Sequence, residues 1–307
     1  MPDRAFDVVS IASWNADLVS RVPRPIARGE SLLATSFEIS PGGKGSNAAV
    51  AAARQGARVA VIARVGDDDF GRMALDLWRA EGIATAHVEQ VPGERSGVAQ
   101  IHVFDDGDNS ISVYRGAGAG LSERHARAAR EALESCRVVM APCEVPMAAL
   151  QASFAIARAA GALTVLNPAP ACALPDGLLA LVDVLTPNES ELRLIAGLAP
   201  DAPVDTAAQA LLAGGAKAVL VTLGAAGCKL WREGAPVLHL PGRHMEVVDT
   251  IGAGDTFTGA LAAALAHDIA SGSGAPRANA AALSVTGRGA IAGMPGRARV
   301  AALLAQA

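Results

Sequence analysis

The chain has 307 residues, of which 51% are hydrophobic and 18% charged, so it can bury a large core and is not a disordered protein. A net charge of −4 argues against a nucleic-acid groove or a basic membrane-binding face. The four cysteines are scattered without a C-x-x-C pair, as in reduced cytosolic proteins. No secretory signal or membrane span is evident, so we expect a cytoplasmic protein without nucleic-acid or membrane partners.

Segments with strand and helix patterns alternate along most of the chain. Apolar residues 8–12 and 57–63 predict buried strands, and residues 48–55 and 70–81 predict helices. The later expected elements are helix 123–135, strand 138–140, helix 147–160, strands 163–166 and 182–185, a helix opened by 186–191, strand 218–224, hairpin strands 230–231 and 237–240, a helix from 256 and a late helix at 279–285. This order predicts one doubly wound α/β domain over residues 1–307, with a mostly parallel sheet covered by helices on both faces.

Two regions break this alternation and predict a small additional sheet. Residues 18–40 contain prolines, glycines and short alternating pieces, which suits irregular strands. Residues 97–104 and 110–114 flank an Asp-Gly turn, which is a hairpin signal. We therefore expect a β-sheet lid whose strands are inserted at about 13–40 and 95–115.

The stretch Gly252-Ala253-Gly254-Asp255 follows a β-branched strand end and runs into an Ala- and Leu-rich helix. Free N–H groups at such a helix start bind anions, and glycines let a phosphate approach the backbone. Asp255 is either a helix cap or a general base beside a phosphoryl group. The segment alone favours the cap, and the rest of the chain favours the base.

A second glycine loop, Gly42-Gly43-Lys44-Gly45-Ser46-Asn47, opens the helix over 48–55. Neither loop has the residue order of a P-loop, and no complete dinucleotide fingerprint opens a helix after the first strand. The chain also has no G-x-S-x-G element and no clustered His/Cys metal set. Two helix starts, one with an acid and one with a lysine, indicate anionic and hydroxylated ligands.

Ordered segments along nearly the whole chain resemble the ribokinase family of carbohydrate kinases, also called PfkB-like. The segments are Asn15-Ala16-Asp17, Gly42-Gly43-Lys44-Gly45-Ser46-Asn47, Leu185-Thr186-Pro187-Asn188-Glu189-Ser190-Glu191 and Asp249-Thr250-Ile251-Gly252-Ala253-Gly254-Asp255-Thr256-Phe257, with Leu166-Asn167-Pro168-Ala169-Pro170 and Val221-Thr222-Leu223-Gly224 in support. The resemblance implies ATP-dependent transfer of the γ-phosphoryl group to a primary hydroxyl of a sugar. D-ribose, converted to ribose 5-phosphate, is the expected substrate.

Matching positions imply catalytic and sugar-binding residues. Asp255 would remove the proton of the attacking hydroxyl, and Gly252, Ala253 and Gly254 would form an anion hole. The residues expected at the sugar are Asn15, Asp17, Gly42, Gly43, Lys44, Asn47, Glu144 and Asp255. Simpler interpretations also exist: Lys44 as a solvated charge, Asp17 as a turn residue and Glu144 as an exposed loop charge.

The resemblance further implies a nucleotide and magnesium side. Asn188 and Glu191 match an N-x-x-E element associated with Mg²⁺ and phosphate positioning, and a carboxylate reaching Mg²⁺ through water suits this ion. The same pair would also form a helix capping box, which is compatible with that role. The residues expected at ATP are Asn188, Thr222, Gly224, Gly227, Gly254 and Asn279.

Three further expectations concern potassium, the lid and Trp14. The positions that match a monovalent-cation loop are Asp249, Ile251, Ser284 and Gly289. Gly293 stands where a serine is usual, so activation by K⁺ is a hypothesis.

The resemblance suggests a homodimer joined through the lid strands, whose edges need covering. Strand alternation would point Trp14 away from the face of Asn15, whereas a turn there would let Trp14 narrow the sugar pocket.

The sequence is also compatible with two functions other than that of a ribose kinase. One is a kinase of the same fold that acts on a nucleoside, a ketose or a deoxy sugar. The other is a non-catalytic sugar sensor. Asp255 and the intact Gly-Ala-Gly segment argue against the sensor, because a sensor needs no base.

Overall fold

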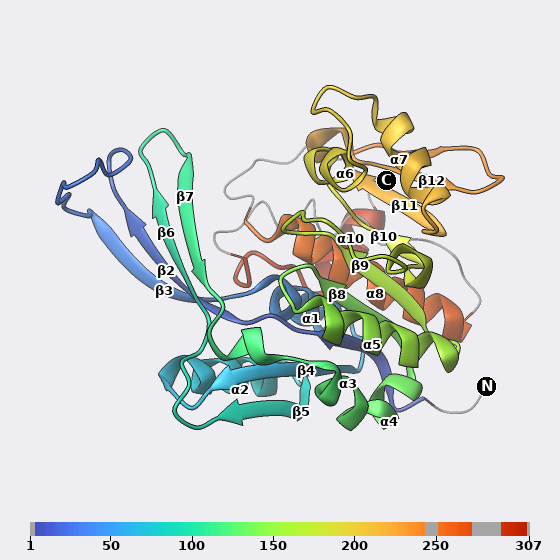
Figure 1. The fold of residues 1–307 in the computed structure, drawn as a ribbon, viewed down its shortest axis with the longest axis horizontal. Coiled ribbons are helices and arrows are strands. Elements are labelled where there is room, and N and C mark those ends of the chain that lie inside the picture. The colour runs from blue at the N-terminus through green and yellow to red at the C-terminus, as the bar shows by residue number, and fades with distance from the viewer. Residues whose placement is uncertain (1–3, 243–250, 272–289, 306–307) are drawn as a thin grey trace.

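The computed structural model describes residues 4–242, 251–271 and 290–305. A large α/β body carries a small sheet that projects from one side of it (Figure 1). Within the described residues, every helix is too short or too polar to traverse a bilayer.

In the described part of the chain, nine strands form the sheet of the body, in the order β13-β12-β11-β10-β9-β8-β1-β4-β5. Its strands are β1 (Phe6–Ile11), β4 (Val59–Gly66), β5 (Ala84–Val91), β8 (Cys136–Pro142), β9 (Leu163–Asn167), β10 (Val184–Leu185), β11 (Ala218–Thr222), β12 (Cys228–Arg232) and β13 (Leu238–Leu240). The strands from β5 to β11 pair in parallel, whereas β12 and β13 pair antiparallel at one end of the sheet. The predicted mostly parallel sheet is confirmed.

Helices cover both faces of this sheet. One face carries α1 (Lys44–Arg54), α2 (Asp69–Ala80) and α8 (Ala253–Ser271), and the other carries α3 (Glu123–Ala128), α4 (Arg130–Glu134), α5 (Met147–Ala159), α6 (Glu189–Ile195) and α7 (Val204–Ala213). The other helices among the described residues are α10 (Arg297–Ala305) and the short 3₁₀ helices η1 (Gly116–Gly120), η2 (Leu179–Leu181) and η3 (Gly224–Ala226). In β1, Val8 joins the core on one face and Val9 the core on the other, because successive side chains of a strand point to opposite faces. The predicted doubly wound architecture is confirmed.

The small sheet expected to act as a lid is present as a separate four-stranded sheet in the order β3-β2-β6-β7, and we refer to it as the lid sheet or lid. Its strands are β2 (Asn15–Arg21), β3 (Ser36–Gly42), β6 (Val98–Val103) and β7 (Asn109–Tyr114). The buried Ser96, just before β6, donates from Oγ to Asp68 Oδ1 at 2.6 Å and accepts from the Gly66 N–H at 3.0 Å. Asp68 also caps α2 by accepting from the Gly71 N–H at 2.8 Å. These bonds tie the root of the lid to the body.

Some elements differ from the sequence prediction. The helix expected over residues 123–135 is interrupted at Ala129, and the buried Ala126, Ala129 and Leu133 keep their apolar face on the core across the break. The sequence does not predict β5, because it is an edge strand with mixed exposure and no clear alternation. It does not predict α7 either, because that helix buries mainly small residues such as Ala207 and Ala208. The helix expected at 279–285 lies outside the described residues.

Candidate active site

The start of α1 packs directly against the turn between β1 and β2. A Cβ atom on Gly43 would lie 2.7 Å from the Ser13 carbonyl oxygen, and one on Gly45 would lie 2.7 Å from the Ala12 Cα atom. Gly43 also has a φ of +92°, which L side chains rarely adopt. The glycines therefore let the start of α1 reach the carboxyl end of β1, where the lid strand β2 begins.

Glu144, which follows β8, closes the N-terminus of α1. Its Oε2 atom accepts hydrogen bonds from the Lys44 backbone N–H at 2.9 Å and from Ser13 Oγ at 2.6 Å. Ser13 Oγ in turn accepts from the Gly45 N–H at 3.0 Å. A carboxylate at a helix N-terminus satisfies unpaired N–H groups and meets the positive end of the dipole. Glu144 is therefore a fixed part of the helix start, and its interpretation as an exposed loop charge is wrong.

Asp255 lies in the first turn of α8, with 5% of its surface exposed. Its Oδ2 atom accepts from Asn47 Nδ2 at 2.9 Å, and its Oδ1 atom accepts from Asn167 Nδ2 at 3.3 Å. Burial raises the pKa of Asp255, while Lys44 and the Asn47 hydrogen bond act in the opposite direction. The Asp255 carboxylate therefore has side-chain partners on two other elements, α1 and β9, which a helix cap does not need.

Asp17 lies on β2 at the root of the lid, two residues after Asn15, which is the register partner of Gly42 in β3. A Cβ atom on Gly42 would overlap the Asp17 carboxylate, so the carboxylate occupies the space that a side chain would need. Burial, with the nearby charges of Glu144 and Asp255, raises the pKa of Asp17 to about 7, and Lys44 opposes the rise. The structure thus brings three predicted acids together around one lysine.

Lys44 is the cation of this group. Its pKa is raised, first by Asp255 and also by Glu144, Glu191 and Asp17, against the effect of its burial. A raised pKa keeps the ammonium charged at any neutral pH. A lysine that is largely buried among carboxylates is not a merely solvated charge.

Asn15 and Trp14 are neighbours in sequence but lie in different environments. Asn15 is 6% exposed, and a Cβ atom on Gly97 would lie 2.5 Å from its amide oxygen. Trp14 belongs to the core beneath α1 and α2, where its ring packs edge-on against Trp78 with centroids 5.7 Å apart. Trp14 lies in the turn between β1 and β2 and not on a strand, yet it is a packing residue and does not narrow an open pocket.

The residues expected at the nucleotide gather near the carboxyl ends of β10 and β11. Asn188 and Glu191 form the capping box of α6: Asn188 Oδ1 accepts from the Glu191 N–H at 2.8 Å, and Glu191 Oε2 accepts from the Asn188 N–H at 2.9 Å. Thr222 pairs with Asn188 in an isolated bridge. The turn that follows carries Gly224 and Gly227, with φ of +56° and +91°.

The expected anion hole opens α8. Gly252 has a φ of +74°, and a Cβ atom there would lie 2.7 Å from Ala290 Cβ. A Cβ atom on Gly254 would meet no atom of the described residues within 4 Å. Ile251 of the expected potassium loop is 41% exposed. The other expected residues Asn279, Asp249, Ser284 and Gly289 lie outside the described residues.

The Glu191 carboxylate suits a magnesium ion that arrives with the nucleotide. Among the described residues, no group of three His, Cys, Asp or Glu side chains forms a cage for a metal. Mg²⁺ usually keeps several waters and binds one or two carboxylates together with substrate phosphates. A single carboxylate at the start of α6 fits that donor set, and Asn188 fixes its orientation.

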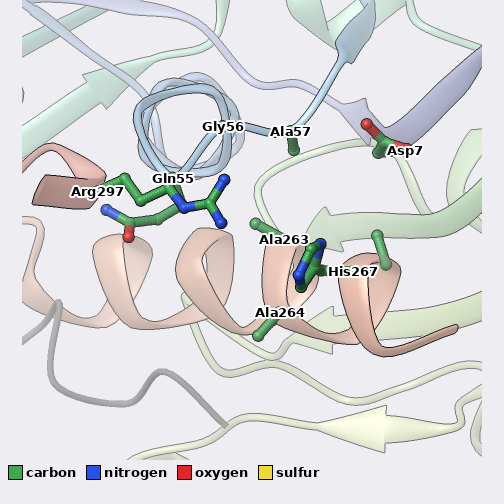
Figure 2. Close-up of a pocket in the computed structure, with 9 residues that line it drawn as sticks. Asp7, Gln55, Gly56, Ala57, Ala263, Ala264, His267 and Arg297 are labelled. Carbon is green, nitrogen blue, oxygen red and sulfur yellow. The ribbon is translucent and has the colours of Figure 1, made fainter. Parts of the chain in front are cut away.

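A cavity of about 70 Å³ lies elsewhere in the molecule (Figure 2). Its lining includes Asp7, near the amino end of β1, and Ala57, just before β4. In open α/β sheets, ligands bind at the carboxyl ends of the strands. The cluster of Asp17, Lys44 and Asp255, at the carboxyl edge, is therefore the candidate active site, and this cavity is not.

Sequence reasoning assigns no role to Ser13 or Asn167, although both contact predicted residues. Asn167 ends the apolar strand β9, and Ser13 is two residues beyond the end of the apolar strand β1. Polar residues at the carboxyl end of a parallel strand are the signal by which they could have been found.

The fold and this cluster define the class: a doubly wound α/β protein with a buried carboxylate in the first turn of a helix at the carboxyl edge of its sheet. The family model described as pfkB family carbohydrate kinase matches residues 5–297. The chain therefore belongs to the pfkB family of carbohydrate kinases, which confirms the predicted family and enzyme class.

Individual relatives agree with this assignment. The chain is 37% identical over 299 residues to the ribokinase of Bacillus subtilis, covering 97% of this chain and 99% of that protein. It is 35% identical over 264 residues to the deoxyribokinase of Salmonella typhi, covering 84% and 85%. It matches the structure of Arabidopsis thaliana ribokinase complexed with ribose and ATP with a TM-score of 0.89 and 30% identity, over 98% of this chain and 99% of that one.

Proposed function

We propose that this protein is an ATP-dependent kinase that transfers the γ-phosphoryl group to the primary hydroxyl of D-ribose and forms ribose 5-phosphate. The observation that carries the proposal is the buried Asp255 carboxylate at the start of α8, held by Asn47 and Asn167. Ribose is the proposed sugar because the Bacillus subtilis relative is a ribokinase and the Arabidopsis thaliana structure contains ribose and ATP.

In the proposed reaction, Asp255 accepts the proton of the sugar hydroxyl while the hydroxyl oxygen bonds to the γ-phosphorus and the bond to ADP breaks. A base is needed because a primary alcohol is a poor nucleophile at neutral pH. The N–H groups of Gly252, Ala253 and Gly254 stabilise charge on the transferred group, since fixed dipoles aimed at developing charge lower the barrier. No atom of the described residues lies within 4 Å of a Cβ position on Gly254, which suits the approach of the phosphoryl group.

The sugar would lie against the root of the lid. Asp17 accepts hydrogen bonds from two hydroxyls, and Asn15 both donates and accepts. Asn47 Oδ1 is buried without a hydrogen-bond partner among the described residues, so it suits a sugar hydroxyl. Gly42 and Gly43 let the ring approach the backbone. Lys44 and Glu144 complete this set of contacts.

The nucleotide would lie along the carboxyl ends of β10 and β11, against Asn188, Thr222, Gly224, Gly227 and Asn279. Glu191 would hold Mg²⁺ through water, and the bound ion neutralises phosphate charge. We also propose that K⁺ activates the enzyme by binding at Asp249, Ile251, Ser284 and Gly289. Equal rates in sodium and potassium salts would contradict the potassium part alone.

The lid would close over the sugar, exclude water and join two copies of the chain. Asp17 of β2 pairs with Ala99 of β6, and Ala99 pairs with Val113 of β7, so Asp17 and Val113 lie in one row across the lid sheet. Ile111 is two residues before Val113 in β7 and therefore lies on the same face. Ile111 and Val113 are 55% and 52% exposed, which a second copy packed on the lid would cover. Sedimentation of Ile111→Lys should show a shift from dimer to monomer, and a monomeric wild type would contradict the dimer.

The decisive experiment measures ADP release with ATP and Mg²⁺ across ribose, 2-deoxyribose, fructose, tagatose and adenosine. Ribose should be preferred, and Asp255→Asn should lose on the order of 10³-fold or more in kcat. Calorimetry should show that the variant still binds ribose. Activity that survives in Asp255→Asn would contradict the base, and tight ribose binding without turnover of any sugar would favour the sensor.

A deoxy sugar is the second candidate substrate. The similarity to the Salmonella typhi deoxyribokinase supports it, because the identity is close to that of the ribokinase relative. A larger kcat/KM for 2-deoxyribose than for ribose would move the substrate and leave the mechanism unchanged.

A further inference from the structure

Asn167 contacts the proposed base, but the proposed reaction gives it no step of its own. It is the last residue of β9, it is 6% exposed, and its Nδ2 donates to Asp255 Oδ1 at 3.3 Å. Its backbone carbonyl accepts from the Cys143 N–H at 3.1 Å. The strand and this loop contact fix the position from which the amide reaches Asp255.

Asn47 donates to the same carboxylate from the other side. It lies on α1, and its Nδ2 reaches Asp255 Oδ2 at 2.9 Å. Its backbone N–H is held by the Gly43 carbonyl at 2.8 Å. Each carboxylate oxygen therefore receives one amide, from two different elements, which opposes rotation of the carboxylate. Each oxygen keeps a further lone pair for the proton of the sugar hydroxyl.

The surroundings of Asp255 make these two donors important. The charged groups that act on it are Lys44 of α1, Glu144 after β8, Glu191 of α6 and Asp17 of β2. Three of these four are carboxylates, and the site is buried, so ionisation of Asp255 is opposed by its neighbours and by desolvation. N–H donors to a carboxylate favour the ionised form, which is the form that accepts a proton.

We infer that Asn167 is a positioning residue that, together with Asn47, forms an amide clamp that orients the Asp255 carboxylate and keeps it ionised. The inference rests on the proposed function, because it needs Asp255 to be the base. It gives Asn167 a role in the turnover step and none in sugar binding.

Asn167→Leu tests the clamp, because leucine is close to asparagine in size and lacks the amide. We expect kcat to fall by about ten- to a hundredfold, with KM for ribose changed by less than about threefold. The acid limb of the kcat–pH profile should move upward by about one pH unit, since loss of a donor raises the pKa of the base. Asn167→Ser, a smaller change, should shift both quantities in the same direction.

Thr186→Val is the matched control. Thr186 is buried at the end of the neighbouring strand β10, and its hydroxyl bonds to Thr258 Oγ1 at 3.1 Å and to the Leu166 carbonyl at 3.3 Å. Its loss should lower the thermal midpoint as Asn167→Leu does. It should leave the acid limb in place, because Asp255 keeps both amides.

The outcomes separate the two levels of inference. Full activity in Asp255→Asn would overturn the proposed function. An inactive Asp255→Asn combined with wild-type kcat and acid limb in both Asn167 variants would overturn the clamp alone. A fall in kcat that Thr186→Val reproduces, with no shift of the acid limb, would also overturn the clamp, because it would reduce Asn167 to a stabilising residue.

Discussion

The sugar side and the nucleotide side of the candidate active site are built in different ways. On the sugar side, the buried Asp255 is bonded by Asn47 from α1 and by Asn167 from β9. On the nucleotide side, the exposed Asn188 and half-buried Glu191 bond mainly to each other within one helix start.

This difference follows from the chemistry proposed for each side. A base that takes a proton needs a fixed orientation and a controlled charge, which contacts between distant elements supply. A nucleotide with Mg²⁺ is held by backbone groups, water and a carboxylate, which one turn supplies. Substitutions on the sugar side should therefore alter catalysis and stability together. The effects of substitutions on the nucleotide side should be confined to the start of α6 and the nucleotide.

Lys44→Met should give the largest effect after loss of the base itself. It leaves Asp17, Glu144 and Asp255 without their shared cation, so ionisation of Asp255 becomes less favourable. We expect kcat/KM to fall by about 10²- to 10³-fold in steady-state assays. Lys217→Met is the control, since it loses only an ion pair with Asp183. A Lys44→Met loss no larger than that of the control would show that the sugar side does not depend on its cation.

Gly42→Ala should raise KM for the sugar by about ten- to a hundredfold, because the new methyl group overlaps the Asp17 carboxylate and displaces it. KM for ATP should change little. Gly254→Ala is the comparison on the phosphoryl side, where the methyl group meets no described atom. That variant should fold normally, bind sugar normally and lose kcat. Unchanged sugar KM in Gly42→Ala would mean that Asp17 does not hold the sugar.

Asp17→Asn should weaken sugar binding and increase the stability of the folded protein. The pKa of Asp17 is about 7 in the folded protein against an ordinary 3.8, so the folded state binds this proton more tightly. The contribution of Asp17 to the free energy of unfolding is therefore largest below about pH 4. It decreases as the pH rises from about 4 to 7 and is lost above about pH 7. At pH 8 the variant should be more stable by roughly 1–3 kcal/mol after allowance for partial exposure.

Urea denaturation at pH 5 and pH 8 checks this prediction, since the difference should shrink at the lower pH. In the wild type, KM for ribose should rise as pH falls below about 7, because the protonated Asp17 accepts fewer hydrogen bonds. A variant that is less stable than the wild type at pH 8 would contradict the raised pKa.

Local signals in the sequence locate the site but do not show how it is held together. The glycine loop before Lys44 and the Gly-Ala-Gly segment before Asp255 each mark a helix start, and both helices begin there in the structure. The bond between Asn47 and Asp255, however, joins residues 208 positions apart. No periodicity or turn signal encodes such a contact, because it depends on the packing of α1 against α8.

Other elements and residues show the same division between local signals and contacts that depend on packing. Alternating apolar residues predict the lid hairpin, whose turn chemistry is local. Sequence reasoning leaves two positions open for Trp14, because its environment depends on Trp78 in a different helix. The resemblance indicates Glu144 as a sugar-side acid, but its bond to the Lys44 N–H is visible only in three dimensions. The assigned roles of these site residues stay predictions.

Asn188→Ala should give the smallest effect on stability and decides whether the nucleotide side is local. Loss of the cap should cost about 1 kcal/mol of stability in urea denaturation, with KM for ribose unchanged. Ser122→Ala removes the comparable capping box formed with His125 at the start of α3, on a helix that carries no predicted site residue. Because both variants lose a similar cap, a difference between them in KM for MgATP reports the contacts of Asn188 with the ligand. A rise in KM for MgATP in Asn188→Ala alone would show that the cap also serves the nucleotide, whereas equal behaviour would make Asn188 a capping residue only.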